Sequence, residues 1–543
     1  MLSALAYFGR PRSIVIGLAV LGAALAAAAL LALWPVRGPK ADAELARSLP
    51  RRVKNDEFVS SAACRSCHPN EYASWHASYH RQMTQPATPD AVKASFHDEV
   101  FPVGENAVRL RRRDDEFWVE LLGSCEPDGR TRPKLRETRV VMTTGSHHMQ
   151  QFWVARGGAG NLLDHLPLMW LVGDAERAGR WIPIGDSVLA PPGEDDATPW
   201  NASCIFCHSV NGNPRLDRKA MTADSEVAEL GIACEACHGG GKKHIEAHRQ
   251  RRAAEAANTA SQKAPDETIV QPGRLDKVRS AEVCGHCHAV AGFASDSIGE
   301  EWYRSGDRFR PGDDLTQFRL TLSPSRLTPE RLAALRKDNA AIWEGNFWPD
   351  GMVRVTGREY NGLIESACYA RGDMTCLACH SLHQSDPNDQ LAARMETNEA
   401  CYQCHAGFRQ TLERHTHHVA DSSGSQCYNC HMPHTTYGLF KAIRSHQITS
   451  PNVATTLDTG RPNACNLCHL DRRISWTAET LTAWYGQPAV EIAEDQLSAS
   501  AGVLWLLRGD AVQRALVAWA FGWPAARRAS GEGWQAPLLA ALL

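Results

Sequence analysis

The chain has 543 residues, a formal net charge of −3, 43% apolar residues and 22% charged residues. This composition excludes an intrinsically disordered chain and a membrane protein with many spans, and the charge argues against a general nucleic-acid binder. The 18 cysteines and 23 histidines are the unusual feature, and their spacing decides whether they form disulfides or bind a cofactor.

Residues 13–34 form an unbroken apolar run near the N-terminus. Its 22 residues match one bilayer span and exceed the apolar part of an ordinary signal peptide. Arg10 and Arg12 precede the run and favour a cytoplasmic N-terminus, although Arg37 and Lys40 follow it. We therefore expect residues 1–40 to be a single transmembrane anchor in the inner (cytoplasmic) membrane of a bacterium. A long cleaved signal peptide is the alternative.

Sixteen of the 18 cysteines belong to eight copies of the string C-x-x-C-H. We number these copies motif 1 to motif 8 in chain order. They are Cys64, Cys67 and His68; Cys204, Cys207 and His208; Cys234, Cys237 and His238; Cys284, Cys287 and His288; Cys376, Cys379 and His380; Cys401, Cys404 and His405; Cys427, Cys430 and His431; and Cys465, Cys468 and His469.

This string is the attachment signal of c-type haem. The two thiols form thioethers with one haem, and the histidine that follows supplies the proximal imidazole of its iron. Zinc knuckles and thioredoxin-like motifs also use C-x-x-C pairs, but neither requires a histidine after every second cysteine. We therefore expect eight covalently bound haem c groups. Haem attachment of this kind takes place outside the cytoplasm, so the haem-binding part should lie in the periplasm.

Two cysteines, Cys125 and Cys368, lie outside the motifs. Two buried thiols, or one disulfide between distant segments, are the ordinary interpretation. Alternatively, Cys368 places a sulfur near a haem iron, because it precedes Cys376 by eight residues.

The segments between the motifs predict some further structure. Alternating apolar residues on either side of Asp114 and Asp115 predict a β-hairpin over 101–122, within a small β region over 101–155. We divide the haem-binding part, 41–470, into 41–200 with motif 1, 201–290 with motifs 2–4, a motif-free insert over 291–375, and 376–470 with motifs 5–8.

Residues 471–543 have a helical character. Helices are predicted over 474–485, 490–507 and 510–522, with Gly-Asp between the last two. Paired amphipathic helices of this kind resemble the start of a HEAT-like repeat array that is cut short.

Fifteen histidines remain after the proximal ones are removed, and a low-spin haem takes a second axial ligand, usually His or Met. His383 and His434 each follow a proximal histidine by three residues, too close to reach the far face of the same haem, so each would serve a neighbour. His286 lies inside a haem-binding loop and is not expected to be a ligand. The distal candidates, in order of preference, are His80, His244, His383, His418 and His446, followed by His147, His165 and His434.

These residues resemble the multihaem cytochromes related to cytochrome c-554 and to the octahaem hydroxylamine oxidoreductase and nitrite reductase lineage. The resemblance covers 58–469 and implies a mainly α fold with sparse secondary structure, in which stacked haem pairs form much of the core. It also implies that His80 and His383 are distal ligands. The matching strings are Trp75-x-x-Ser78-x-His80, Cys234-Glu-Ala-Cys237-His238-Gly-Gly-Gly, Met374-Thr-Cys376-x-x-Cys379-His380-x-x-His383 and Cys427-x-x-Cys430-His431-Met432-Pro433.

The sequence leaves two functions open. The preferred one is electron transfer through haems with two histidine ligands, between a quinol-side donor or other redox partner proteins and an acceptor. The alternative is an octahaem oxidoreductase acting on nitrite, hydroxylamine or an oxidised sulfur compound, with Arg358 and Tyr360 as weak catalytic candidates. All eight motifs end in His, whereas octahaem nitrite reductases replace one such His by Lys. The C-terminal helices could also bind a protein partner.

Overall fold

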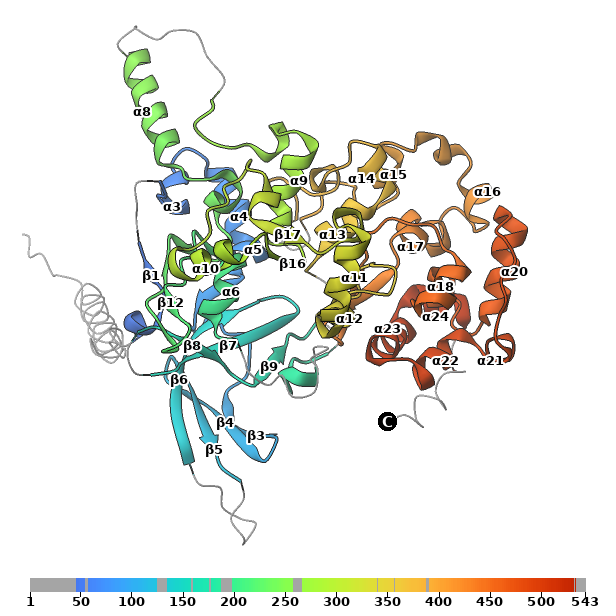
Figure 1. The fold of residues 1–543 in the computed structure, drawn as a ribbon, viewed down its shortest axis with the longest axis horizontal. Helices are drawn as coiled ribbons and strands as arrows, with labels where there is room; N and C mark the ends of the chain where they lie inside the picture. Colours follow the sequence, from blue (N-terminus) through green and yellow to red (C-terminus); the bar gives the residue numbers. More distant parts are fainter. Residues whose placement is uncertain are drawn as a thin grey trace, which may run out of the picture. The chain divides into compact units, whose positions relative to one another are not determined.

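The computed structural model describes residues 45–53, 57–124, 134–157, 160–174, 177–186, 198–256, 266–338, 340–355, 357–386, 390–531 and 533. Residues from Leu49 onward form one compact unit (Figure 1). All motif residues, Cys368 and every histidine lie within the described ranges, whereas Cys125 lies outside them.

The expected localisation in an inner membrane requires a correction. Within the described ranges, no helix is both long and apolar enough to cross a bilayer. The apolar run 13–34 that motivated the expectation lies outside those ranges.

An antiparallel sheet of nine strands dominates the N-terminal part of the described chain (Figure 1). Its main path runs β10-β9-β7-β6-β5-β4-β3, while β2 pairs with β6 and β8 pairs with β7. The strands are β2 (Thr84–Pro86), β3 (His97–Val103), β4 (Asn106–Arg113), β5 (Glu116–Leu122), β6 (Lys134–Thr144), β7 (Met149–Ala155), β8 (Leu163–His165), β9 (Leu168–Leu171) and β10 (Arg180–Pro183).

The predicted hairpin around Asp114 and Asp115 is confirmed. β4 and β5 pair antiparallel from Ala107↔Leu122 to Arg113↔Glu116, so these two aspartates form the turn. Asp114 takes a φ of 53°, a left-handed conformation that Asp tolerates in tight turns.

The prediction of a mainly α fold with a small β region over 101–155 is wrong. The sheet extends from β2 to β10, well beyond the predicted region. Short strand pairs occur elsewhere too, such as β18 (His434–Tyr437) with β19 (Lys441–Arg444). The resemblance suggested too little strand because strands such as β8 and β9 are short and lack a long alternating pattern.

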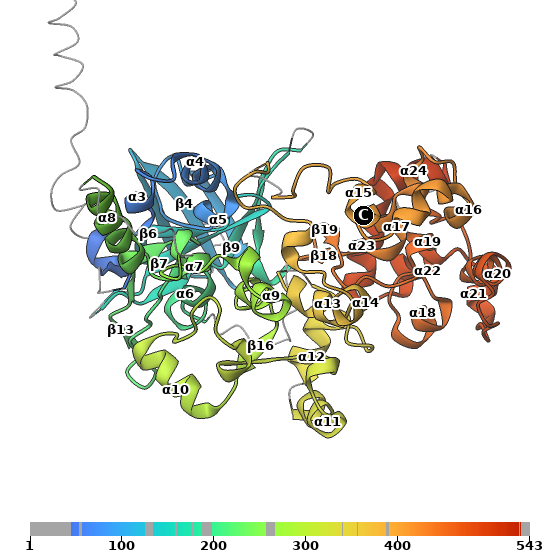
Figure 2. The same ribbon diagram turned by 90° about the horizontal axis from the view of Figure 1, so that it is seen from above.

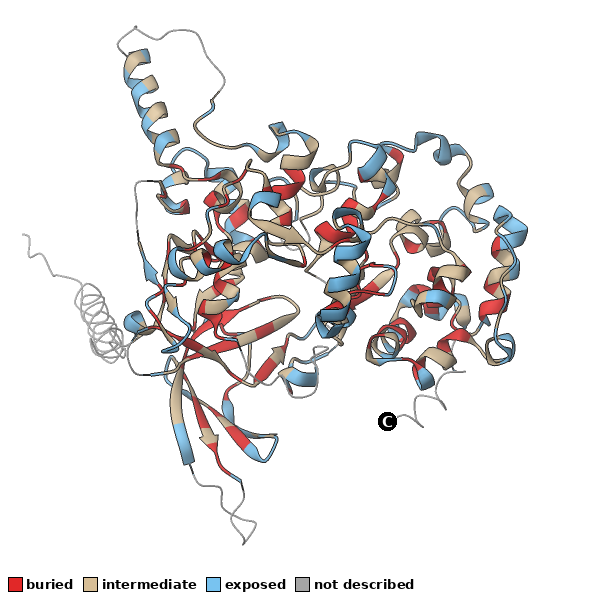
Figure 3. Cartoon of the chain, in the orientation of Figure 1, coloured by how far each residue is buried: buried red, intermediate tan, exposed pale blue. Residues whose placement is uncertain are grey.

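The sheet has a hydrophobic core of its own. Leu110 and Phe152 are fully buried, and Phe96 packs edge-on against both Phe152 and Trp181. Figure 3 shows buried stretches along several strands of the sheet. This core cluster contains no cysteine and no histidine of a motif. The sheet can therefore be stable without help from a bound haem.

Most motifs form a short helix or a single turn. Most longer helices lie outside the motifs, although α9 ends with Cys284 and Gly285 of motif 4, and Figure 2 shows the helices from above. The helices of more than six residues are α4 (Pro69–Ala77), α8 (Lys242–Ala256), α9 (Lys277–Gly285), α10 (Asp296–Ser305), α11 (Pro329–Asp338), α12 (Ala340–Asn346), α13 (Glu359–Glu365), α18 (Val453–Thr459), α20 (Ile474–Tyr485), α22 (Ala501–Arg508), α23 (Ala511–Gly522) and α24 (Pro524–Ser530).

The predicted C-terminal helices occur as α20 and α23, and the predicted helix over 490–507 is split into α21 (Glu494–Ser498) and α22. Asp510 caps α23 in a reciprocal capping box with Gln513. Leu516 and Val517 of α23 pack in one cluster with Leu467 of motif 8. These helices thus complete the core around the last motif (Figures 1 and 2). That they begin a HEAT-like array stays a prediction.

A truncation in the sheet core tests whether the sheet is independent of the motifs. Phe152→Ala should cost about 3–5 kcal/mol of unfolding free energy because it empties a fully buried site. Urea unfolding followed by circular dichroism measures this loss, and haem content by pyridine haemochrome should stay unchanged. The control is Val100→Ala on β3, where the side chain is 45% exposed. A loss of haem in the Phe152 variant would contradict the independence of the sheet.

Candidate haem-binding sites

Each motif folds so that its histidine lies beside its two cysteines. The backbone N–H of the histidine donates to the carbonyl of the first cysteine, as in His68 to Cys64 at 2.9 Å and His469 to Cys465 at 2.8 Å. The same bond forms in motifs 2, 4, 5 and 6. Motifs 3 and 7 lie wholly within the helices α7 (Cys234–His238) and α17 (Cys427–His431). One helical turn therefore presents two thiols and an imidazole together.

Six motif histidines each face a second histidine from a distant part of the chain. The distances between ring centres lie between 6.0 and 6.3 Å in all six pairs. The pairs are His68 with His244, His288 with His80, His238 with His383, His380 with His446, His431 with His415, and His469 with His418.

This spacing fits one metal ion between two imidazoles. A metal–imidazole bond of about 2 Å, with about 1.1 Å from the bonded nitrogen to the ring centre, separates two trans imidazoles by about 6 Å. Rings that merely stack lie closer, as His147 and Tyr79 do at 3.7 Å. The donor set of two thiols and two imidazoles is therefore suited to a haem c iron at each of these six motifs.

The second ring nitrogen of these histidines is also arranged for ligation. Nδ1 of His238 lies 2.8 Å from the Val270 carbonyl, and Nδ1 of His431 lies 3.0 Å from the Thr449 carbonyl. On the facing side, Nδ1 of His418 lies 2.6 Å from the Thr416 carbonyl. A carbonyl only accepts, so Nδ1 donates its proton and Nε2 keeps a free lone pair. A neutral imidazole in this state is ready to bind a metal.

Five of the eight distal candidates face a motif histidine: His80, His244, His383, His418 and His446. His80 is half-buried with a buried Nδ1, and this burial lowers its pKa to about 4, so the ring is neutral. A neutral ring at this position can bind a metal.

The other three candidates pack elsewhere. His434 lies against Trp519 and Trp523, with ring centres 4.3 and 4.7 Å apart, and burial lowers its pKa to about 2. His147 stacks on Tyr79, and His165 lies edge-on to Trp153. Aromatic packing thus accounts for these three positions.

His415 faces His431 but was not among the distal candidates. It lies in α16 (Leu412–Thr416). His417, the first residue after this helix, takes a left-handed φ of 56° that ends the helix. This turn sends His415 toward motif 7 and His418 toward motif 8. The dense His-Thr-His-His string was the available signal, since two motifs can draw ligands from one cluster.

Neither His208 nor His405 is paired with a histidine ring in this way among the described residues. His405 is exposed, whereas Nδ1 of His208 is buried and has no hydrogen-bond partner. Burial lowers the pKa of His208 to about 4, and the nearby Arg358 guanidinium lowers it further. Arg358 also lies close to Cys207 of the same motif.

The two catalytic candidates differ in position. Arg358 lies between motif 2 and Tyr437, whose ring is 5.0 Å from that of His148. Tyr360 is buried in a core cluster, and a Cβ at Gly285 would lie only 2.7 Å from its ring. Arg358 thus lies close to Cys207 and His208 of motif 2. Tyr360 instead packs from α13 against Gly285 of α9.

Thiols of different motifs contact one another. Hydrogen-bond partners are Cys64 with Cys234, Cys207 with Cys287, Cys284 with Cys376, and Cys401 with Cys427. Electrostatic neighbours are Cys237 with Cys284, Cys379 with Cys404, and Cys430 with Cys465. These contacts connect the motifs in the order 1-3-4-5-6-7-8, and motif 2 joins at motif 4.

Cys368 is a free, half-buried thiol on α14 (Ala367–Arg371). A thiolate at Cys368 would raise the pKa of Cys401, so Cys368 lies near motif 6. The suggested disulfide to Cys125 lies outside the described residues.

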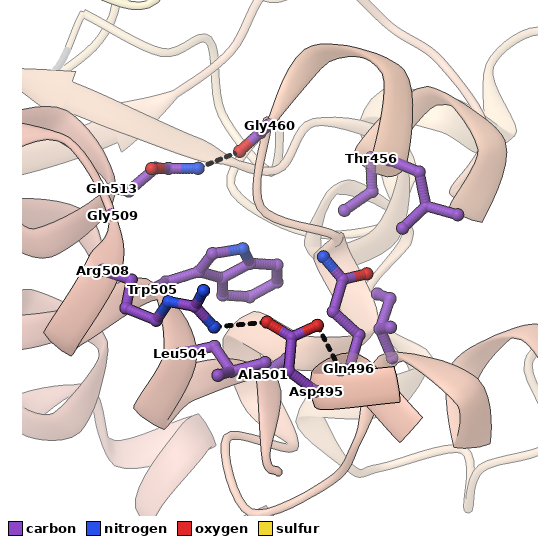
Figure 4. Close-up of a pocket in the computed structure, with 12 residues that line it drawn as sticks. Thr456, Gly460, Asp495, Gln496, Ala501, Leu504, Trp505, Arg508, Gly509 and Gln513 are labelled. Carbon is purple, nitrogen blue, oxygen red and sulfur yellow. Dashed lines mark hydrogen bonds and ion pairs between the residues drawn. The ribbon is translucent and has the colours of Figure 1, made fainter. Parts of the chain in front are cut away.

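A separate pocket of about 270 Å³ lies among the C-terminal helices (Figure 4). Trp505 lines it, and Asp495 and Arg508 form an ion pair beside it. The lining includes no cysteine or histidine among the described residues, so the pocket is distinct from the motif sites.

With eight motifs and paired imidazoles, the chain is a multihaem c-type cytochrome, and comparisons support this class. A family model described as a doubled CXXCH motif matches residues 369–410. A model of cytochrome c554 and c-prime matches residues 63–102, which bears out the resemblance drawn from the sequence.

The fold is similar to that in a crystal structure titled outer cell wall cytochrome OcwA, with a TM-score of 0.50 and 16% sequence identity. The match covers 80% of this chain and 87% of that one. No curated protein matches the sequence.

Gly424, which packs against the ring of His418, offers a test of whether the position of that ring matters. A Cβ at Gly424 would lie 2.2 Å from the His418 ring, so Gly424→Ala should push the ring away from His469. We expect one haem to change from low to high spin in the EPR spectrum of the oxidised protein. Gly407→Ala is the control, because its Cβ would meet nothing within 4 Å. An unchanged spectrum in both variants would argue against His418 as a ligand.

Proposed function

We propose that this multihaem cytochrome transfers electrons through eight haem c groups, one at each motif. A haem c at each motif would supply a one-electron iron couple. The supporting observation is the set of six imidazole pairs spaced for one iron each. Two histidines on one iron leave no place for a substrate, which suits electron transfer better than catalysis.

The contacts between motifs support a continuous route. Cys237 and Cys284 bring motif 3 beside motif 4, and Cys284 and Cys376 bring motif 4 beside motif 5. Neighbouring attachment points keep successive cofactors close, which electron hopping requires. Motif 2 lies beside motif 4 through Cys207 and Cys287, so it would exchange electrons with the rest of the route through motif 4.

Exposed attachment points suggest where redox partner proteins dock. Among the described cysteines, Cys67 of motif 1 and Cys404 of motif 6 are the exposed ones. A partner protein could approach closest at these two thioether positions. We therefore propose that electrons enter and leave at motifs 1 and 6.

Replacing one paired histidine tests the ligand assignment. Pyridine haemochrome should give eight haems per chain, and His383→Ala should convert one haem to a high-spin form that binds cyanide. The matched control is His76→Ala, since His76 stacks on Tyr72 and faces no motif histidine. Six or fewer haems in the mature protein, or no new high-spin signal in the His383 variant, would contradict the proposal.

A second function rests on the surroundings of motif 2. Nδ1 of His208 is buried, no second histidine ring faces His208 among the described residues, and Arg358 lies nearby. Tyr437 also lies near Arg358, and His148 packs edge-on against Tyr437; both groups can handle protons. This site could act on nitrite, hydroxylamine or an oxidised sulfur compound.

Nitrite binding discriminates this second function. A catalytic motif 2 predicts a high-spin signal in the oxidised protein that changes when nitrite is added. Arg358→Gln should then weaken nitrite binding about tenfold, because a charged hydrogen bond is lost. Arg409→Gln, at an exposed arginine paired with Glu399, should leave the affinity unchanged. A wild-type spectrum without a nitrite-sensitive high-spin haem would rule the second function out.

A further inference from the structure

The paired histidines differ in the group that accepts the Nδ1 proton. His238, His380 and His431 donate to the backbone carbonyls of Val270, Gln390 and Thr449. His418 and His446 also donate to carbonyls. His288 of motif 4 instead donates to a carboxylate, Oε2 of Glu359, at 2.7 Å. A carboxylate in place of a carbonyl sets motif 4 apart from these five histidines.

Glu359 is held firmly against motif 4. It is the first residue of α13, and its other carboxylate oxygen accepts the backbone N–H of Gly357 at 3.1 Å. The N–H of Tyr360 donates to the backbone carbonyl of His288 at 3.0 Å. Both carboxylate oxygens of Glu359 therefore act as hydrogen-bond acceptors, one of them directly on His288.

Asp266 makes a related contact, since Oδ2 lies 2.8 Å from Nδ1 of His244. The same oxygen accepts from Nε2 of His248 at 2.7 Å, so its charge is shared between two rings. These three residues could hold a cation by spacing alone, but His244 already faces His68. Glu359 has the more direct effect on a single histidine.

We propose that Glu359 is a positioning residue that gives the haem at motif 4 a lower reduction potential than it would have with a neutral acceptor. This inference rests on the proposed ligation of an iron by His288 and His80. A carboxylate that accepts from Nδ1 draws the proton toward itself and increases the electron density on Nε2. A more basic ligand stabilises ferric over ferrous iron, so the reduction potential falls.

The position of motif 4 gives this effect a consequence. Its cysteines contact motif 2 through Cys207 and motif 5 through Cys376, and they neighbour motif 3 through Cys237. Motif 4 therefore adjoins motifs 2, 3 and 5. A lower potential there would make electron transfer through this junction less favourable.

A matched control exists in the same loop. His286 lies two residues before His288, and its Nε2 donates to Oδ2 of Asp307 at 2.7 Å. The other oxygen of Asp307 accepts the backbone N–H of Phe309 at 2.9 Å, as Glu359 does with Gly357. His286 stacks on Phe309 and faces no motif histidine. Asp307 therefore reproduces the bonding of Glu359 on a histidine that is not a proposed ligand.

An EPR-monitored redox titration of the full haem-loaded protein tests the proposal. Glu359→Gln keeps an oxygen that can accept from His288 but removes the charge, so one low-spin component should shift in g-value and titrate at a higher potential. Glu359→Asp, which withdraws the carboxylate by one methylene, should give an intermediate shift. Asp307→Asn should leave the g-values of all components unchanged.

The outcomes separate this inference from the proposed function. Low-spin signals in the wild-type protein test the histidine ligation itself, independently of any variant. An unshifted potential in both Glu359 variants, with low-spin signals and haem content preserved, would overturn the role of Glu359 alone. An equal shift in the Asp307 variant would overturn it as well, because the effect would then come from nearby charge and not from the axial ligand. If Glu359→Gln does not mature, Glu359→Asp decides the result.

Discussion

The structure depends on one geometric constraint, the separation of about 6 Å between paired imidazoles, which would hold one iron between them. Each motif supplies one ring at a defined place, because one helical turn joins the histidine to its cysteines. The facing ring comes from far along the chain, as in His80 with His288 and His68 with His244. The fold must hold distant segments in register to within a fraction of an ångström.

Helix α13 positions several of the paired histidines, although the segment that contains it has no motif. Glu359 holds His288 through its side chain, and Ser366 after the helix accepts the N–H of Ile448 and donates to the carbonyl of His446. Gly362 lets the backbone of His446 approach so closely that a Cβ would lie 2.6 Å from the next backbone nitrogen. One helix therefore positions ligands of both motif 4 and motif 5.

The nine-stranded sheet has a different part in the structure. Its core contains none of the motif residues, so it folds as a body beside the haem-binding segments. Its contribution to the sites is positional: β2 follows directly on the short helix that carries His80, and the turn between β6 and β7 brings His147 and His148 beside Tyr79 and Tyr437. The sheet thus lines the surroundings of motif 2 without supplying a paired ligand.

The sequence by itself determined the cofactor class and the proximal residues, because C-x-x-C-H is a local string whose chemistry needs only one helical turn. It also indicated the hairpin at Asp114, where turn residues lie between two alternating strands. The facing histidines were harder to predict. Three of the six pairs join residues more than 100 positions apart, which leaves no local pattern. His415 and His418 lie close in sequence, and the left-handed turn at His417 separates them. Only the tertiary structure decided which ring faces which motif, which motifs adjoin, and that Glu359 lies on His288, because these depend on how distant segments pack.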